Sequence, residues 1–191
     1  MGLLSTIRKQ KLKDKEIRLL MLQVGLDNAG KTTIVKQLLG EDVKSVSPTL
    51  GFNIKTVDWQ GYKLNIWDVG GQSTLRPFWR NYFEKTDAIL WVVDASSLDR
   101  LPDCKVELDK VIQEDRLTGA GLLILVNKID VIATEESRTT VLDLVNDTLQ
   151  IDKITNHNCT ILECSAYTGE NLKEGLSWIT EEVKQRLYKF D

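Results

Sequence analysis

One stretch, Met21–Thr33, constrains the fold more than any other part of the chain; its sequence is MLQVGLDNAGKTT. An apolar run ends at Val24, a glycine-rich loop follows from Gly25 to Thr32, and a helical apolar pattern comes next. A strand, this loop and a helix are the context in which the phosphate-loop motif G-x-x-x-x-G-K-[ST] binds a nucleoside triphosphate. The sequence therefore predicts a nucleotide-binding α/β domain, while this motif leaves the base undetermined.

Each part of the phosphate loop has a physical role. Its glycines allow successive backbone N–H groups to curl round phosphate oxygens, and the N-terminus of the next helix adds partial positive charge. We expect Lys31 to bind the phosphates as a point charge and the Thr32 hydroxyl to bind Mg²⁺. The predicted nucleotide contacts in this loop are Gly25, Leu26, Asp27, Asn28, Ala29, Gly30, Lys31, Thr32 and Thr33.

Composition narrows the class of protein. A length of 191 residues, 42% hydrophobic and 28% charged, is typical of one globular domain with its own core. No apolar run approaches the length of about 18 residues that a membrane span needs. The net charge is −3 although residues 1–18 alone carry +4, so the body is acidic, which argues against nucleic-acid binding. Three cysteines without metal-ligand spacing indicate reduced thiols in the cytosol.

Apolar segments with strand and helix periodicity alternate along the chain, which predicts an α/β fold: a mostly parallel six-stranded sheet with helices on both faces. Two alternating segments joined by Gln60-Gly61 form a predicted hairpin. The polar motifs follow strand ends, where such sheets bind ligands. The predicted strands are 17–24, 52–59, 62–67, 86–93, 121–126 and 159–163, and the helical apolar faces fall within 34–39, 101–111, 142–149 and 172–187.

The N-terminal residues form a separate unit in this prediction, with a basic amphipathic helix over 1–16 and the nucleotide-binding domain over 17–191. Leu3, Leu4 and Ile7 fall within one arc of that helix. Gly2 fits the acceptor position of the myristoylation pattern M-G-x-x-x-[ST]. We favour a lipid-free helix that docks on the domain or on a partner, because a single acyl chain binds membranes only marginally.

The tetrapeptide Asn127-Lys128-Ile129-Asp130 indicates which base is bound. A carboxylate at Asp130 accepts hydrogen bonds from both N1–H and the exocyclic amine of guanine, whereas adenine offers no such pair of donors. This favours GTP over ATP and argues against a kinase or ATPase. We expect Asn127 and Lys128 to tie this loop to the phosphate loop and cover the ring. Ser165 and Ala166 follow the last strand, where a backbone N–H can contact the base.

Five motifs occur in the order and spacing of the small Ras-superfamily GTPases: the phosphate loop, Pro48-Thr49, DVGGQ at 68–72, NKID at 127–130, and Ser165-Ala166. Within that superfamily, GLDNAGKTT, WDVGGQ and RPFWRNYF resemble the ADP-ribosylation factor family. The resemblance covers essentially the whole chain and implies a P-loop GTPase domain. Two departures stand out: the approach to Gly25 is two residues longer than usual, and Ile129 replaces a common glutamine.

The resemblance implies a GTP hydrolase that binds GTP, GDP and Mg²⁺. It assigns Thr49 to Mg²⁺ and the γ-phosphate, and Asp68 to Mg²⁺ through water. It also gives the Gly71 N–H to the γ-phosphate and has Gln72 orient the attacking water. Because no arginine can be assigned to the γ-phosphate, we expect slow hydrolysis, of order 10⁻² s⁻¹ or below, until an activating protein supplies the missing charge. The predicted catalytic residues are Lys31, Thr49, Gly71 and Gln72.

The resemblance also implies partners. Phe52, Trp67 and Tyr82 match an aromatic trio that the family exposes between its switch segments, and the helix bearing Leu3, Leu4 and Ile7 is expected to leave the domain in the GTP state. The implied partners are tubulin folding cofactors, carriers of lipidated cargo, a GTPase-activating protein and an exchange factor. We expect a cytoplasmic protein, monomeric when free, with weak or no membrane binding and association with microtubules or centrosomes. Two alternatives stay open, a membrane-trafficking GTPase that recruits coats or tethers and a GTP-binding subunit of a larger assembly.

Overall fold

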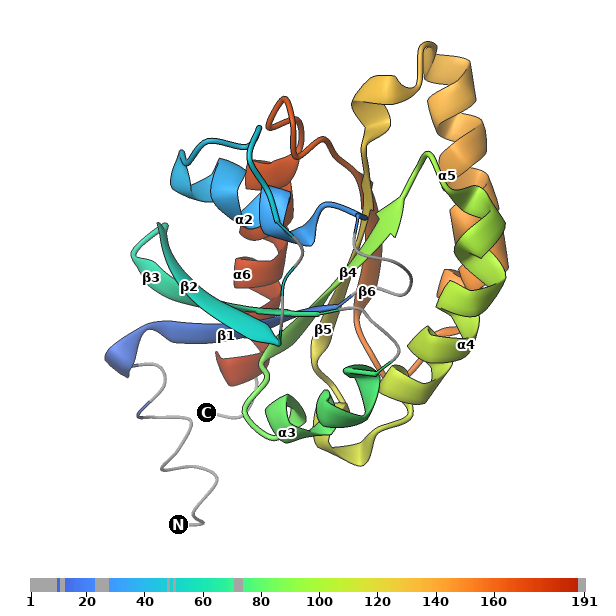
Figure 1. Cartoon of the computed structure of the whole chain (residues 1–191). Coiled ribbons are helices and arrows are strands. Elements are labelled where there is room, and N and C mark those ends of the chain that lie inside the picture. Colours follow the sequence, from blue (N-terminus) through green and yellow to red (C-terminus); the bar gives the residue numbers. More distant parts are fainter. Residues whose placement is uncertain are drawn as a thin grey trace.

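A computed structural model describes residues 10, 13–22, 28–47, 49, 51–70 and 74–188 (Figure 1). Its sheet has six strands in the order β2-β3-β1-β4-β5-β6. β2 is antiparallel to β3, and every other neighbouring pair is parallel. The predicted mostly parallel six-stranded sheet is therefore confirmed. The strands are β1 (Glu16–Leu22), β2 (Phe52–Trp59), β3 (Tyr62–Val69), β4 (Ala88–Asp94), β5 (Gly121–Asn127) and β6 (Cys159–Glu163).

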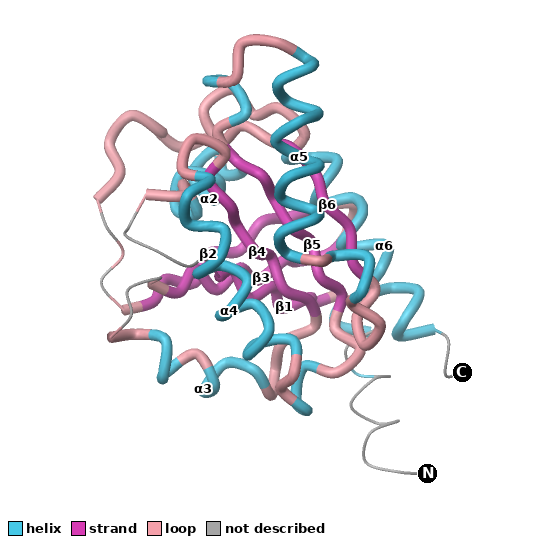
Figure 2. Tube along the Cα trace, turned by 90° about the vertical axis from the view of Figure 1, so that its right-hand side faces the viewer, coloured by secondary structure: helices cyan, strands magenta, loops and turns pink. Residues whose placement is uncertain are grey.

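Helices cover both faces of the sheet, as predicted. α4 and α5 lie on one face and α2 and α6 on the other (Figure 1), and Figure 2 looks onto the α4–α5 face. The helices are α2 (Lys31–Leu39), α3 (Arg80–Phe83), α4 (Leu101–Ile112), α5 (Glu135–Leu149) and α6 (Leu172–Tyr188). Short 3₁₀ turns are η1 (Arg76–Phe78), η2 (Leu98–Arg100), η3 (Asp115–Leu117), η4 (Ile129–Val131) and η5 (Ile151–Lys153).

The sequence of β4 is almost continuously apolar because both faces of this strand are covered. Ile89 and Trp91 belong to the core under α4 and α5, whereas Leu90 and Val92 belong to the core under α2 and α6. Successive side chains of a strand point to opposite faces, so a strand covered on both sides buries every residue. Such a strand places its last residue, Asp94, at the ligand-binding edge of the sheet.

Several strand boundaries differ from the prediction by one or two residues, and two of these differences have a clear local reason. β4 begins at Ala88 because Thr86 is held in the turn after α3, where its N–H and hydroxyl donate to the carbonyls of Phe83 and Tyr82. β3 continues through Asp68 to Val69 because β2 still pairs with it there. Asp68 is therefore a strand residue with a fixed direction rather than the start of a loop.

His157 lies in a loop, yet its side chain is buried. Its two ring nitrogens are 2.8 and 3.1 Å from the carbonyl oxygens of Ala120 and Ile112. The side chain therefore joins the end of α4 to the residue before β5.

The predicted N-terminal residues Gly2, Leu3, Leu4 and Ile7 lie outside the described part of the chain. The division into a helix over 1–16 and a domain over 17–191 stays a prediction; β1 begins at Glu16. Among the described residues, no helix is both long enough and apolar enough to cross a bilayer.

Candidate nucleotide-binding site

Those predicted nucleotide-binding residues that the structure describes gather at the carboxyl ends of the parallel strands and at the N-terminus of α2. Gly25, Leu26, Asp27, Gly71 and Gln72 lie outside the described residues. The described part of the phosphate loop begins at Asn28.

Gly30 and Lys31 form the start of α2. Gly30 has φ +88°, and a Cβ on it would lie 2.3 Å from the Asn127 side-chain nitrogen, so only glycine fits there. Lys31 is 5% exposed, and its Nζ lies 3.9 Å from Asp68 Oδ1. Lys31 therefore places a buried positive charge at the N-terminus of α2, where the helix dipole also favours an anion such as a phosphate.

Three predicted Mg²⁺ ligands from distant segments meet in one cluster of oxygen atoms. The Thr32 hydroxyl lies 2.6 Å from Asp68 Oδ2 and 2.9 Å from the Thr49 hydroxyl, which is 3.3 Å from the same carboxylate oxygen. Asp68 is 1% exposed, and its other oxygen, Oδ1, is buried and has no hydrogen-bond partner among the residues that the structure describes. Hydroxyl and carboxylate oxygens are the donors that Mg²⁺ prefers, so these residues fit that ion.

The segment around Thr49 touches the start of the segment that leads to Gly71. The Gly70 N–H donates to the Gly51 carbonyl at 2.9 Å, and a Cβ on Gly70 would lie 2.5 Å from the Leu75 side chain and 3.1 Å from the Thr49 carbonyl oxygen. The Gly70 carbonyl accepts a hydrogen bond from the Trp79 indole. The Leu75 side chain and the backbone of the Thr49 segment together leave little room for a side chain at position 70.

Asn127 connects the phosphate loop to the loop after β6. It is 1% exposed; its amide donates to the Ala29 carbonyl at 2.7 Å, and its side-chain oxygen accepts from the Ala166 N–H at 2.9 Å. The predicted tie between the base-binding loop and the phosphate loop is present. Because one side chain satisfies both backbone groups, the spacing of the two loops depends on it.

Lys128 has a partner that the sequence analysis missed. Its Nζ lies 2.7 Å from Asp94 Oδ2, and Asp94 Oδ1 accepts from the Ser96 N–H. Asp94 is the last residue of β4, and a polar residue at the end of a parallel strand could have been predicted to belong to the site. A cavity of about 340 Å³ lies beside this pair; its lining includes Asn28, Ala29, Asp94, Arg100, Cys104 and Lys128.

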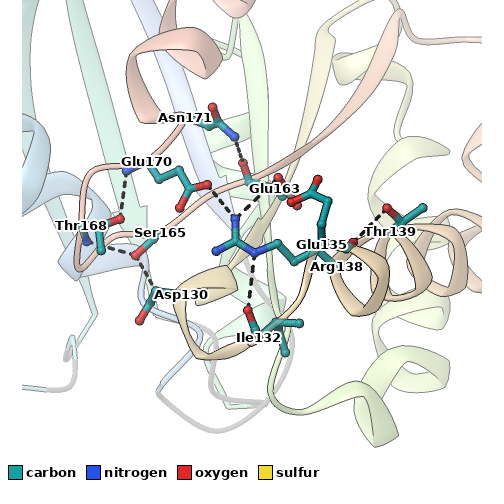
Figure 3. Close-up of polar contacts among 10 residues, drawn as sticks. All are labelled: Asp130, Ile132, Glu135, Arg138, Thr139, Glu163, Ser165, Thr168, Glu170 and Asn171. Carbon is teal, nitrogen blue, oxygen red and sulfur yellow. Dashed lines mark hydrogen bonds and ion pairs between the residues drawn. The ribbon is translucent and has the colours of Figure 1, made fainter.

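Asp130 and Ser165 come from different loops and touch (Figure 3). The Ser165 hydroxyl donates to Asp130 Oδ1 at 2.5 Å; Ser165 is buried, whereas Asp130 is exposed on η4. Cys164 is buried at the end of β6 next to Ser165, and burial, followed by the charges of Glu170 and Asp130, raises the pKa of its thiol. This thiol is therefore a neutral packing group beneath the base-binding loops.

The predicted aromatic trio is one cluster. Ring centroids are 6.3 Å apart for Phe52 and Trp67, 5.5 Å for Phe52 and Tyr82, and 5.2 Å for Trp67 and Tyr82. Phe52 is 53% exposed. An exposed large aromatic ring supported by two others is a common feature of protein-binding surfaces.

Comparison with known proteins decides the family. The model of the ADP-ribosylation factor family matches residues 3–183. The chain belongs to the ADP-ribosylation factor family. Similar curated proteins are named ADP-ribosylation factor-like protein 2; those of Arabidopsis thaliana, Dictyostelium discoideum and Drosophila melanogaster are 55%, 48% and 46% identical, each over the whole of both chains.

A solved member of this family supports the fold. The Arl6 (BBS3) small GTPase of Trypanosoma brucei, determined with the nucleotide analogue GppNp, is 26% identical to this chain, with a TM-score of 0.73. The match covers 89% of this chain and 98% of that one. As an ADP-ribosylation factor family member, the chain is a regulatory GTPase that binds guanine nucleotide and hydrolyses GTP. Proteins of this class act with effectors, activating proteins and exchange factors.

Proposed function

We propose that the chain is a GTP-controlled switch whose nucleotide and Mg²⁺ are held by the residues gathered at the sheet edge. The observation that carries this proposal is the meeting of the Thr32 and Thr49 hydroxyls at the Asp68 carboxylate. In this proposal the two hydroxyls hold Mg²⁺ directly, Asp68 holds it through water, and Lys31 binds the phosphates. Bound Mg²⁺ would neutralise charge on the β- and γ-phosphate oxygens.

Guanine specificity is assigned to Asp130. Its exposed carboxylate accepts from N1–H and the exocyclic amine of the base, while Ser165 fixes the carboxylate from behind and Asn127 sets the distance to the phosphate loop. The Ala166 N–H is bonded to Asn127, which positions the backbone that faces the base. Asp130→Asn is expected to shift preference from guanosine to xanthosine nucleotides, and an unchanged preference would contradict this role.

Switching is assigned to the two segments that meet at Gly70. Thr49 and the Gly71 N–H are proposed to contact the γ-phosphate, so that its loss frees both segments, and Gln72 is proposed to orient the attacking water. The hydrogen bond between Gly70 and Gly51 makes the two segments one unit in the present structure. The aromatic cluster of Phe52, Trp67 and Tyr82 is the surface that such a change would present to effectors.

The proposed cellular role is control of tubulin folding and of the release of lipidated cargo, in the cytoplasm and near microtubules. Its support is the resemblance to proteins named ADP-ribosylation factor-like protein 2 along the whole chain. The partners to test are tubulin folding cofactors and carriers of lipidated cargo. A pull-down with Gln72→Leu and Thr32→Asn should capture different partners, whereas capture of the same set by both variants would contradict the switch.

A membrane-trafficking role is the second candidate, because Gly2 fits the myristoylation pattern. It predicts an acylated Gly2 and GTP-dependent binding to liposomes. Intact-mass measurement of the protein from its own cells, followed by liposome flotation, separates the two roles.

The oxygen cluster is tested by release of a fluorescent GDP analogue with and without a Mg²⁺ chelator. Wild type should release nucleotide faster when Mg²⁺ is removed. Thr32→Ala should release it fast under both conditions. Thr56→Ala removes a threonine hydroxyl bonded to Asn65 on the exposed hairpin and should behave as wild type. Full Mg²⁺ dependence in Thr32→Ala would overturn the assignment.

A further inference from the structure

The two base-binding loops are joined at their inner edge. The Ile129 N–H donates to the Cys164 carbonyl at 3.1 Å, and the Ser165 hydroxyl donates to Asp130. Both contacts lie close to the ends of β5 and β6. These contacts do not reach the outer parts of the loops, which extend to Ile132 in the loop after β5 and to Glu170 in the loop after β6.

The loop that carries Ser165 is a closed turn. The Ser165 N–H donates to the Glu170 carbonyl at 3.1 Å, and the Gly169 N–H donates to the Ser165 carbonyl at 2.8 Å. The Thr168 N–H donates to the Ser165 hydroxyl at 3.0 Å. Because these bonds make residues 165–170 one unit, a force on Glu170 is transmitted to Ser165.

Arg138, on the first turn of α5, reaches both outer parts (Figure 3). Its Nη1 lies 2.8 Å from Glu170 Oε1, and its Nε donates to the Ile132 carbonyl at 3.5 Å. Glu163, the last residue of β6, is 4.0 Å from the same guanidinium. Ile132 directly follows the 3₁₀ turn η4, which carries Asp130. One planar guanidinium therefore lies between the two base-binding loops.

Hydrogen bonds at the start of α5 hold the backbone of Arg138 in place. Thr134 caps the helix by accepting from the Ser137 N–H at 3.2 Å, and the Arg138 N–H donates to the Thr134 carbonyl at 3.0 Å. A guanidinium is planar and holds its N–H donors in fixed relative directions, whereas the N–H donors of a lysine ammonium rotate freely. The position thus suits a rigid connector rather than a solvated surface charge.

We propose that Arg138 is a positioning residue for guanine selectivity, which holds the Asp130 and Ser165 loops at the spacing that lets the Asp130 carboxylate meet the edge of the base. The inference rests on the proposed role of Asp130. The inner contacts remain when Arg138 is removed, so the loops pivot about them instead of unfolding. The consequence is poorer alignment of Asp130 with the two donors of guanine.

The test compares release rates of fluorescent GDP and IDP, because inosine lacks the exocyclic amine that Asp130 is proposed to bind. Arg138→Ala should narrow the preference for GDP over IDP by about threefold, the size expected for loss of a partly exposed ion pair. Arg138→Lys should show a GDP-over-IDP preference between those of Arg138→Ala and wild type. Lys105→Ala removes an ion pair to Asp109 on α4 and should leave the ratio unchanged.

The outcomes separate this inference from the function beneath it. If Asp130→Asn abolishes the GDP preference while Arg138→Ala changes both release rates equally or not at all, the positioning role is wrong and the proposed function stands. If Asp130→Asn leaves the GDP preference unchanged, the proposed role of Asp130 and the positioning role of Arg138 are both wrong. Should Arg138→Ala not fold in a thermal melt, Glu170→Gln removes the partner charge instead; it should narrow the ratio, and an unchanged ratio would contradict the role.

Discussion

Removal of the Asn127 side chain should affect both the phosphate loop and the loop after β6. Asn127→Ala leaves two backbone groups without partners, the Ala29 carbonyl and the Ala166 N–H, at a position that is 1% exposed. An unsatisfied buried group costs about 1–3 kcal/mol, so the expected loss in free energy of unfolding is about 2–6 kcal/mol. This is a large share of the total stability of about 5–15 kcal/mol that such a domain has.

Asn156→Ala provides the matched control. Asn156 is exposed and donates one hydrogen bond, to the Ile112 carbonyl at 2.6 Å. Water can replace that donor, so the expected loss is about 0.5–1.5 kcal/mol. The two variants lose the same side-chain atoms and differ in burial and in the number of partners.

The measurement is denaturant unfolding at saturating GDP and Mg²⁺, repeated at a tenfold higher GDP concentration so that loss of bound nucleotide is separated from loss of intrinsic stability. Release of a fluorescent GDP analogue is followed in parallel and should be faster in Asn127→Ala alone. If Asn127→Ala destabilises the protein by no more than Asn156→Ala, the tie between the loops contributes nothing and the reasoning fails.

Three further predictions concern other parts of the molecule. Burial raises the pKa of Cys159 from 9.0 to about 12, so the folded state keeps this proton at pH values where the unfolded state has lost it, and the free energy of unfolding should fall as pH rises from 9.0 toward 12. Denaturant unfolding of wild type and Cys159→Ala across that range tests this prediction. An equal dependence of the free energy of unfolding on pH in the two proteins would contradict it. Gly70→Ala should slow GTP hydrolysis, because the new methyl group would lie 2.5 Å from the Leu75 side chain and 3.1 Å from the Thr49 carbonyl oxygen, and an unchanged single-turnover rate would contradict this. Phe52→Ala should change the free energy of unfolding by less than about 1 kcal/mol, since the ring is 53% exposed, yet weaken effector capture at least about tenfold, and a variant that binds effectors normally would exclude Phe52 from the interface.

Local patterns predicted much of the fold. The two-residue periodicity of 52–59 and 62–67 predicted the hairpin, and the apolar run at 121–126 predicted a buried central strand, because each pattern reports which faces are covered. Strand ends were predicted less well. Whether Thr86 joins a strand depends on hydrogen bonds to Tyr82 and Phe83, and periodicity does not contain that information.

Some residues of the site could likewise be predicted from local motifs, and others could not. The phosphate-loop and NKID motifs predicted the chemistry of Lys31 and Asp130, because each motif places particular donors and acceptors beside a strand end. Arg138 carried no such signal. It lies in an ordinary polar helix turn, and its role arises from Glu170, 32 residues further along the chain.

By itself, the sequence determined the alternation of strands and helices, the polar residues at strand ends and the preference for a guanine nucleotide, since these depend on neighbours along the chain. Only the tertiary structure decided that Thr32 meets Asp68, 36 positions away, and that Asn127 bonds to Ala29, 98 positions away. The reason is that strand order and register bring the ends of nonadjacent segments to one edge, and a distance of a few ångströms between two side chains depends on how the whole sheet packs.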